Sequence, residues 1–208
     1  MADAHPASVT IDYPDRKLNR LTSFLRIFTV IPILILFALL LGLVYSQNAK
    51  SGEGGWVAGM GFIFLPVVLM LLFRKKYPRW WYDWNFNLLN FCYRVDAYFY
   101  LLTDVYPSTD EEQSVHLELP YPYAATELNR WLPLVKWFLA FPHIFVLIFL
   151  GLAALVVTLI AWFAILFIGL YPRGMFNFVV DVFRWSLRVT AYAIILTTDK
   201  YPPFRLGV

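Results

Sequence analysis

The sequence predicts an all-α integral membrane protein made of two tandem repeats, each a transmembrane or re-entrant helical hairpin followed by an amphipathic helix. Hydrophobic residues make up 60% of the 208 positions and charged residues only 15%, too little charge to cover a soluble globule of this size. Three stretches carry no charge: residues 27–45, 56–73 and 137–170. Each is close to or above the roughly 20 residues that a membrane-spanning helix needs. A bilayer is therefore the expected environment.

Two polar stripes, 94 residues apart, indicate the duplication. Both advance along the chain by four, three and four residues, which places their members on one face of a helix that is otherwise apolar and aromatic. The first stripe is Asp83, Asn87, Asn90 and Arg94, and the second is Asn177, Asp181, Arg184 and Arg188.

The match extends beyond the stripes. Downstream and upstream motifs recur as pairs: Tyr77-Pro78-Arg79 with Tyr171-Pro172-Arg173, Asp104 with Asp199, Leu18-Asn19-Arg20 with Leu128-Asn129-Arg130, and Arg26 with Lys136. The Leu-Asn-Arg pair and the pair Arg26 and Lys136 are 110 residues apart instead of 94, so the first copy holds 16 extra residues between these blocks and the stripes. Most of them fall in the glycine-rich segment 46–55, which we expect to be a flexible external loop.

These matches divide the chain into a first repeat at residues 1–112 and a second at residues 113–208. The hairpins are expected at about 27–73 and 137–170, and the striped helices at about 80–103 and 176–198. As one helix, segment 137–170 would extend roughly 51 Å, well beyond a hydrocarbon core of ~30 Å. We therefore expect a turn near Gly151, with arms that either cross the bilayer or turn back before the far side.

Positive charges flank both hairpins and are scarce within them. Arg20 and Arg26 precede the first apolar run and Arg74 follows the second, while Lys136 and Arg173 flank the third. By the positive-inside rule, the ends of both hairpins face the cytoplasm. The chain is therefore expected in the bacterial inner (cytoplasmic) membrane as a multi-pass protein, with both termini cytoplasmic. The striped helices either span the membrane or lie at its surface, and the tryptophans beside the first stripe favour the surface.

The arginines of the stripes are the candidate binding residues. Asp181 can pair with Arg184 one turn away, which leaves Arg188 available for a lipid phosphate or a partner's carboxylate. The candidate lipid- or partner-binding residues are Arg79, Arg94, Arg173, Asp181, Arg184 and Arg188. The alternative is that the stripes pack the two copies together or merely anchor surface helices.

The sequence offers no catalytic constellation. Asp104 and Asp199 each stand two residues before Tyr-Pro, a pattern suited to ending a helix through hydrogen bonds to nearby backbone. The three histidines lack the spacing of a helix-borne metal site, and Cys92 is the single cysteine. We therefore expect no catalytic residues, no metal, no cofactor and no nucleic acid partner.

The second copy carries a set of short motifs that resembles a known family. The motifs are Lys136-Trp137-Phe138-Leu139-Ala140-Phe141-Pro142-His143, Tyr171-Pro172-Arg173-Gly174-Met175-Phe176, Arg184-Trp185 and Thr198-Asp199-Lys200-Tyr201-Pro202-Pro203-Phe204. Together they resemble the uncharacterised bacterial membrane family called domain of unknown function 4389. The first copy departs from this pattern at Ile33, Trp80 and Asn90. The resemblance implies a small integral membrane protein of hairpin-plus-amphipathic units and carries no known activity.

The expected function is non-enzymatic: an accessory or scaffold subunit that binds lipid headgroups or a larger membrane complex. Membrane lipids and a protein partner, or a second copy in the membrane, are the expected partners. A pseudo-symmetric small transporter or channel that uses the polar stripes is the alternative. A lipid-modifying enzyme with its site at the headgroups is a third hypothesis.

Overall fold

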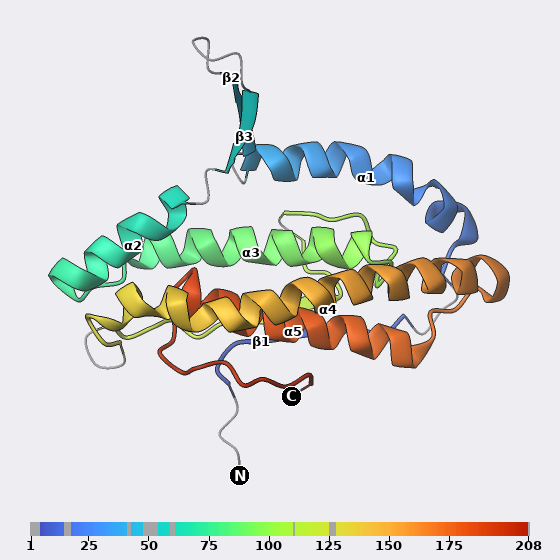
Figure 1. The fold of residues 1–208 in the computed structure, drawn as a ribbon. Helices are drawn as coiled ribbons and strands as arrows, with labels where there is room; N and C mark the ends of the chain where they lie inside the picture. The colour runs from blue at the N-terminus through green and yellow to red at the C-terminus, as the bar shows by residue number, and fades with distance from the viewer. Residues whose placement is uncertain are drawn as a thin grey trace.

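The computed structural model describes residues 5–14, 18–40, 43–47, 54–58, 61–109, 111–124 and 128–207. Its helices are α1 Arg20–Leu40, α2 Gly61–Arg74, α3 Arg79–Phe99, α4 Leu132–Ile168 and α5 Arg173–Ala193. Its strands are β1 Ser8–Ile11, β2 Leu43–Gln47, β3 Gly54–Ala58 and β4 Val115–Glu118. The described part of the chain is mostly helical, as the sequence predicts, although the expected all-α class omits two small sheets (Figure 1).

The expected turn near Gly151 is wrong. Helix α4 runs without a break for 37 residues, about 55 Å at 1.5 Å per residue, and passes straight through this glycine. Every residue around Gly151 is apolar, so a turn there would leave backbone groups without polar partners, whereas a continuous helix satisfies them internally. The helix ends instead at Gly169, whose φ of +81° suits a glycine in the left-handed region.

Residues 1–112, the first predicted repeat, hold two apolar helices where residues 113–208 hold one unbroken helix. Helix α1 has 21 residues and α2 has 14, and between them β2 and β3 pair as an antiparallel hairpin with Leu43 opposite Ala58. The segment 46–55, expected as a loop, therefore contributes strand residues at both ends, and residues 48–53 lie outside the described part. The residues that the sequence comparison counted as extra in the first predicted repeat fall between α1 and α2, where this hairpin lies.

The striped helices form close to their expected positions but end earlier, at Phe99 and Ala193 instead of 103 and 198. Soon after each end stands a leucine in the left-handed region, Leu101 with φ +63° and Leu196 with φ +62°, a backbone conformation that no α-helix continues. Both helices begin directly after a proline of the repeated Tyr-Pro-Arg sequence, because proline fixes φ and needs no N–H partner there.

The sequence analysis predicted none of the four strands, and two of them, β1 and β4, lie between α3 and α5. β1 pairs antiparallel with β4, and Val9 is opposite Leu117. β1 packs on α5 and β4 on α3, whereas α1 packs on α3 and α4 packs on α5. In Figure 1, α3 and α5 run in opposite directions, as α1 and α4 do.

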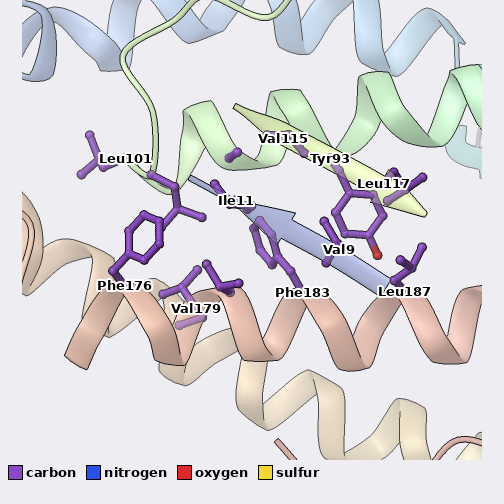
Figure 2. Close-up of a cluster of buried hydrophobic side chains, with 14 of the residues drawn as sticks. Val9, Ile11, Tyr93, Leu101, Val115, Leu117, Phe176, Val179, Phe183 and Leu187 are labelled. Atoms are coloured by element: carbon purple, nitrogen blue, oxygen red, sulfur yellow. The ribbon is translucent and has the colours of Figure 1, made fainter. Parts of the chain in front are cut away.

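The main core joins these elements. In Figure 2, side chains of β1 and β4 lie between α3 and α5, so that Val9 and Ile11 face Phe183 while Tyr93 comes from the other helix. Tyr93 and Phe183 pack edge to face with ring centroids 5.9 Å apart. Residues from both predicted repeats therefore form one continuous core.

Candidate functional site: internal ion pairs, an apolar cavity and an apolar outer face

The stripe arginines Arg94 and Arg188 bind the protein's own backbone. Arg94 Nη1 donates to the Ser108 carbonyl at 2.8 Å, and Arg188 Nη2 donates to the Gly207 carbonyl. Both side chains are buried, 6% and 5% exposed. Burial, together with the nearby charges of Arg205 and Arg184, lowers the pKa of Arg188. Each arginine therefore holds the segment that follows its own helix and is turned away from solvent.

Asp181 and Arg184 are close together, as their spacing predicts. Arg184 Nη1 lies 2.8 Å from Asp181 Oδ1, and Arg184 Nε donates to the Val9 carbonyl at 3.0 Å. The pair therefore fastens β1 to α5. Arg94 lies on the other striped helix, and no contact in the described part joins it to this pair.

Arg79 and Arg173 occupy matching positions at the starts of α3 and α5, and each lies over a tyrosine ring. The guanidinium of Arg79 is 5.4 Å from the Tyr121 ring centroid, and that of Arg173 is 5.0 Å from the Tyr13 centroid. Both arginines are exposed.

These two tyrosines make reciprocal contacts between the halves of the chain. Tyr13, in the first half, donates its hydroxyl to the Tyr171 carbonyl, and Tyr121, in the second half, donates to the Tyr77 carbonyl. Both distances are 2.5 Å. Together with the pairing of β1 and β4, these bonds join the halves by equivalent contacts in both directions.

Two buried ion pairs were missed by the sequence analysis. Arg26 pairs with Asp104, and Lys136 Nζ lies 2.6 Å from Asp199 Oδ1. The cations are 4% and 0% exposed. The available signal was the repeat itself, because Arg26 matches Lys136 and Asp104 matches Asp199.

Asp104 and Asp199 do not end their helices through nearby backbone, as the sequence analysis expected. Asp104 accepts the backbone N–H of Asn19 at 2.9 Å, and Asp199 accepts that of Asn129 at 2.6 Å. These partners are far away in sequence, so the aspartates tie the starts of the apolar helices to the ends of the striped helices instead of capping nearby backbone. A buried cation with a carboxylate and further hydrogen bonds is a stable arrangement, whereas either charge alone would be costly.

His143 fixes the C-terminal segment. Trp185 Nε1 donates to His143 Nδ1 at 3.1 Å, and the imidazole stacks on the ring of Phe204 with centroids 3.8 Å apart. In the part of the chain that the structure describes, no group of three or more His, Cys, Asp or Glu side chains could hold a metal ion.

A cavity of about 390 Å³ lies between α1 and α4. Its apolar lining comes from both halves of the chain: Val30, Ile31 and Leu34 of α1, Phe99 and Leu101 at the end of α3, and Leu155, Leu159 and Trp162 of α4. Three polar side chains complete the wall: Ser23, Arg26 and Thr158. This size is typical of pockets for small apolar ligands.

The outer faces of α1 and α4 are apolar and exposed. Phe138, Phe141 and Phe167 of α4 are 81%, 71% and 79% exposed, and Phe28 of α1 is 67% exposed. Of the described helices, α4 is the one that is long and apolar enough to cross a membrane. Only 17% of its most apolar 18 residues are buried, unlike the core helix of a soluble protein. A surface of this kind indicates contact with lipid or another apolar partner.

Exposed positive charges gather where α2 ends and α4 begins. Arg74, Lys75 and Lys76 follow the apolar part of α2, and Arg130 precedes α4. Lys75 and Arg130 line one open surface hollow together with Trp131. These cations are exposed, unlike Arg94 and Arg188 of the stripes.

Comparison with known proteins finds one related family. Residues 131–205 match the model of the family described as "Domain of unknown function (DUF4389)". This confirms the resemblance for the segment from the start of α4 to the C-terminal segment, which lies within the second predicted repeat. No curated protein and no solved structure matches the chain.

Proposed function

We propose that this chain is a non-enzymatic membrane protein that serves as an accessory or scaffold subunit, binding lipid headgroups or a larger membrane complex. The observation that carries the proposal is the exposed apolar face of α1 and α4. The striped helices α3 and α5 pack beneath these helices, and their candidate arginines Arg94, Arg184 and Arg188 bind internal groups. The first feature favours a bilayer, and the second leaves the polar stripes with a structural role.

The proposal places α1 and α4 in the bilayer and α3, α5 and the β1–β4 sheet on the cytoplasmic side. Charge supports the orientation, because Arg130 and Arg173 flank the two ends of α4 and the helix itself carries only the paired Lys136. With both ends on one side, the unbroken α4 lies within the membrane along its length, and both termini of the chain are cytoplasmic.

Duplication is part of this proposal. Matched pairs of residues make matched contacts: Arg26–Asp104 and Lys136–Asp199, Tyr13 with Tyr171 and Tyr121 with Tyr77. β1 and β4 pair with Val9 opposite Leu117. These contacts support a two-fold relation between residues 1–112 and 113–208, in which each half completes the other.

The proposal assigns headgroup binding to the exposed basic residues near the start of α4. Arg130 and Lys75 form no ion pair with another described residue and lie beside the exposed Trp131, an arrangement suited to lipid phosphate at a membrane interface. Basic residues near an anionic membrane surface contribute about 1 kcal/mol each.

Alkaline carbonate extraction of cell membranes tests the proposal. The chain is expected to stay in the membrane pellet, and release into the wash would contradict a membrane-embedded α4. Purified in mild detergent, the chain should retain lipid or a protein partner, and recovery of free monomer alone would count against an accessory role.

A pair of matched variants tests the headgroup cluster. Arg130→Gln should weaken binding of phosphatidylglycerol to the chain purified in mild detergent by about fivefold at low salt, with a smaller loss at high salt. Arg205→Gln, which removes one charge from the C-terminal segment, should leave that binding unchanged. Equal losses in both variants would show that only net charge matters.

A further inference from the structure

The cavity between α1 and α4 is apolar on most of its wall but contains buried polar atoms that lack hydrogen-bond partners. Ser23 is 0% exposed and Arg26 is 4% exposed. Neither Ser23 Oγ nor Arg26 Nε has a partner among the described residues. Buried polar atoms are normally satisfied, so a pair of unsatisfied groups on one cavity wall indicates a ligand that satisfies them.

The chemistry of these atoms selects the ligand. The guanidinium Nε–H can only donate, and a serine hydroxyl can donate as well, so the complementary group is an oxygen acceptor. Asp104 already balances the charge of Arg26, whose Nη1 also donates to the Tyr98 carbonyl at 3.0 Å. A neutral carbonyl therefore fits this wall better than a free carboxylate, which would add an unbalanced charge.

The remaining wall fits a hydrocarbon chain. Leu155 and Leu159 face the cavity from α4, and Val30 and Leu34 face it from α1. These are the helices whose outer surfaces are exposed and apolar, so the cavity lies where acyl chains are at hand. The geometry points to a binding site for one acyl chain of a membrane phospholipid, with its ester carbonyl at Ser23 and Arg26. This inference rests on the proposed membrane location of α1 and α4.

Such a lipid would join the two halves of the chain. Ser23 and Arg26 belong to the first repeat, and Leu159 and Trp162 belong to the second. Trp162 Nε1 already donates to the Ser23 carbonyl at 3.1 Å across the same boundary. The bound chain fills the gap beside this contact and thereby stabilises the contact between α1 and α4.

Photo-crosslinking tests the site. The full-length protein is reconstituted in vesicles that contain phosphatidylcholine with a diazirine near the carbonyl end of one acyl chain, and the crosslinked peptides are mapped by mass spectrometry. Crosslinks should concentrate on residues 23–34 and 155–162. Leu159→Trp, which fills the cavity, should abolish this concentration, whereas Ile160→Trp, at an exposed position of α4 that does not line the cavity, should leave it intact.

Ser23→Ala provides a milder variant that keeps the cavity open. Loss of one hydrogen bond should weaken lipid binding about fivefold, measured by the lipid concentration that gives half-maximal crosslinking. Crosslinks spread evenly along α1 and α4 and unchanged by Leu159→Trp would overturn the site, although the proposed function would stand. Release of the chain by carbonate would contradict both the lipid site and the proposed function. Displacement of the phospholipid by stoichiometric palmitate would identify a free fatty acid and contradict the phospholipid assignment.

Discussion

At the scale of single residues, the two buried ion pairs are the most demanding contacts in the molecule. Lys136 is fully buried, and Asp199 with the Thr198 carbonyl, which accepts from Nζ at 2.7 Å, satisfies its charge. Removing the carboxylate leaves an uncompensated cation in an apolar setting. Asp199→Asn should therefore lower the free energy of unfolding by about 3–5 kcal/mol, measured by denaturant titration in detergent micelles.

A surface carboxylate supplies the control for this prediction. Glu118 accepts a hydrogen bond from Ser8 at the exposed edge of the β1–β4 sheet, so Glu118→Gln should change the free energy of unfolding by no more than about 0.5 kcal/mol. Asp104→Asn should match Asp199→Asn in direction. A loss for Asp199→Asn as small as that of the control would contradict the account of the pair.

Asp96 predicts a pH dependence of stability. Burial raises the pKa of its carboxyl to about 7, from an ordinary value of 3.8. Between these two values the folded chain keeps a proton that the unfolded chain has lost, so stability falls as pH rises through this window. The slope is at most about 1.4 kcal/mol per pH unit. Asp96→Asn should remove this slope in unfolding experiments from pH 4 to pH 7, and an unchanged slope would assign it to other groups.

Individual residues were only partly predictable. The helical spacing placed Asp181 beside Arg184, and this contact exists because residues three apart share a helix face. The partners of Arg94 and Arg188 are carbonyls of Ser108 and Gly207 in irregular segments. No local pattern specifies the path of such a segment, so the sequence could not show that these arginines are buried.

At the scale of elements, the continuity of α4 gives a direct prediction. A Cβ at Gly151 would meet open space, and alanine is favoured over glycine inside a helix by roughly 0.5–1 kcal/mol. Gly151→Ala should therefore stabilise the protein slightly, measured by its unfolding midpoint in detergent. A clear loss of stability would indicate a turn at this position.

Gly169→Ala is the matched control on the same helix. Gly169 ends α4 with φ +81°, a conformation that costs an alanine about 1 kcal/mol or more. This variant should be less stable than the parent. The two Gly→Ala changes should shift stability in opposite directions, which distinguishes a glycine inside the helix from one at its end.

The elements show which signals can be read from a sequence. The striped helices were predictable because their spacing, their starting prolines and their repetition agree. The predicted turn in α4 was wrong because the prediction assumed that a helix must cross the bilayer along the shortest path. β1 and β4 were missed because four-residue strands give a weak alternating signal, and their pairing joins residues over a hundred positions apart.

At the scale of the whole molecule, three features characterise the fold. They are the exposed apolar face of α1 and α4, the internally bound polar stripes of α3 and α5, and the reciprocal contacts between the two halves of the chain. The positive charges suggested the side on which the ends of α4 lie, and the repeat suggested that α3 and α5 are equivalent. How the halves pack could not be predicted, because long-range pairing depends on contacts that neither half of the chain contains alone.

Membrane sidedness of the two matched arginines tests the central claim most directly. Arg79→Cys and Arg173→Cys are made separately in a Cys92→Ala background and treated with a membrane-impermeant maleimide in intact spheroplasts and in inverted membrane vesicles. Both cysteines should react only in inverted vesicles, because the proposed orientation places the starts of α3 and α5 on the cytoplasmic side. Reaction of the two cysteines from opposite sides of the membrane would contradict the account.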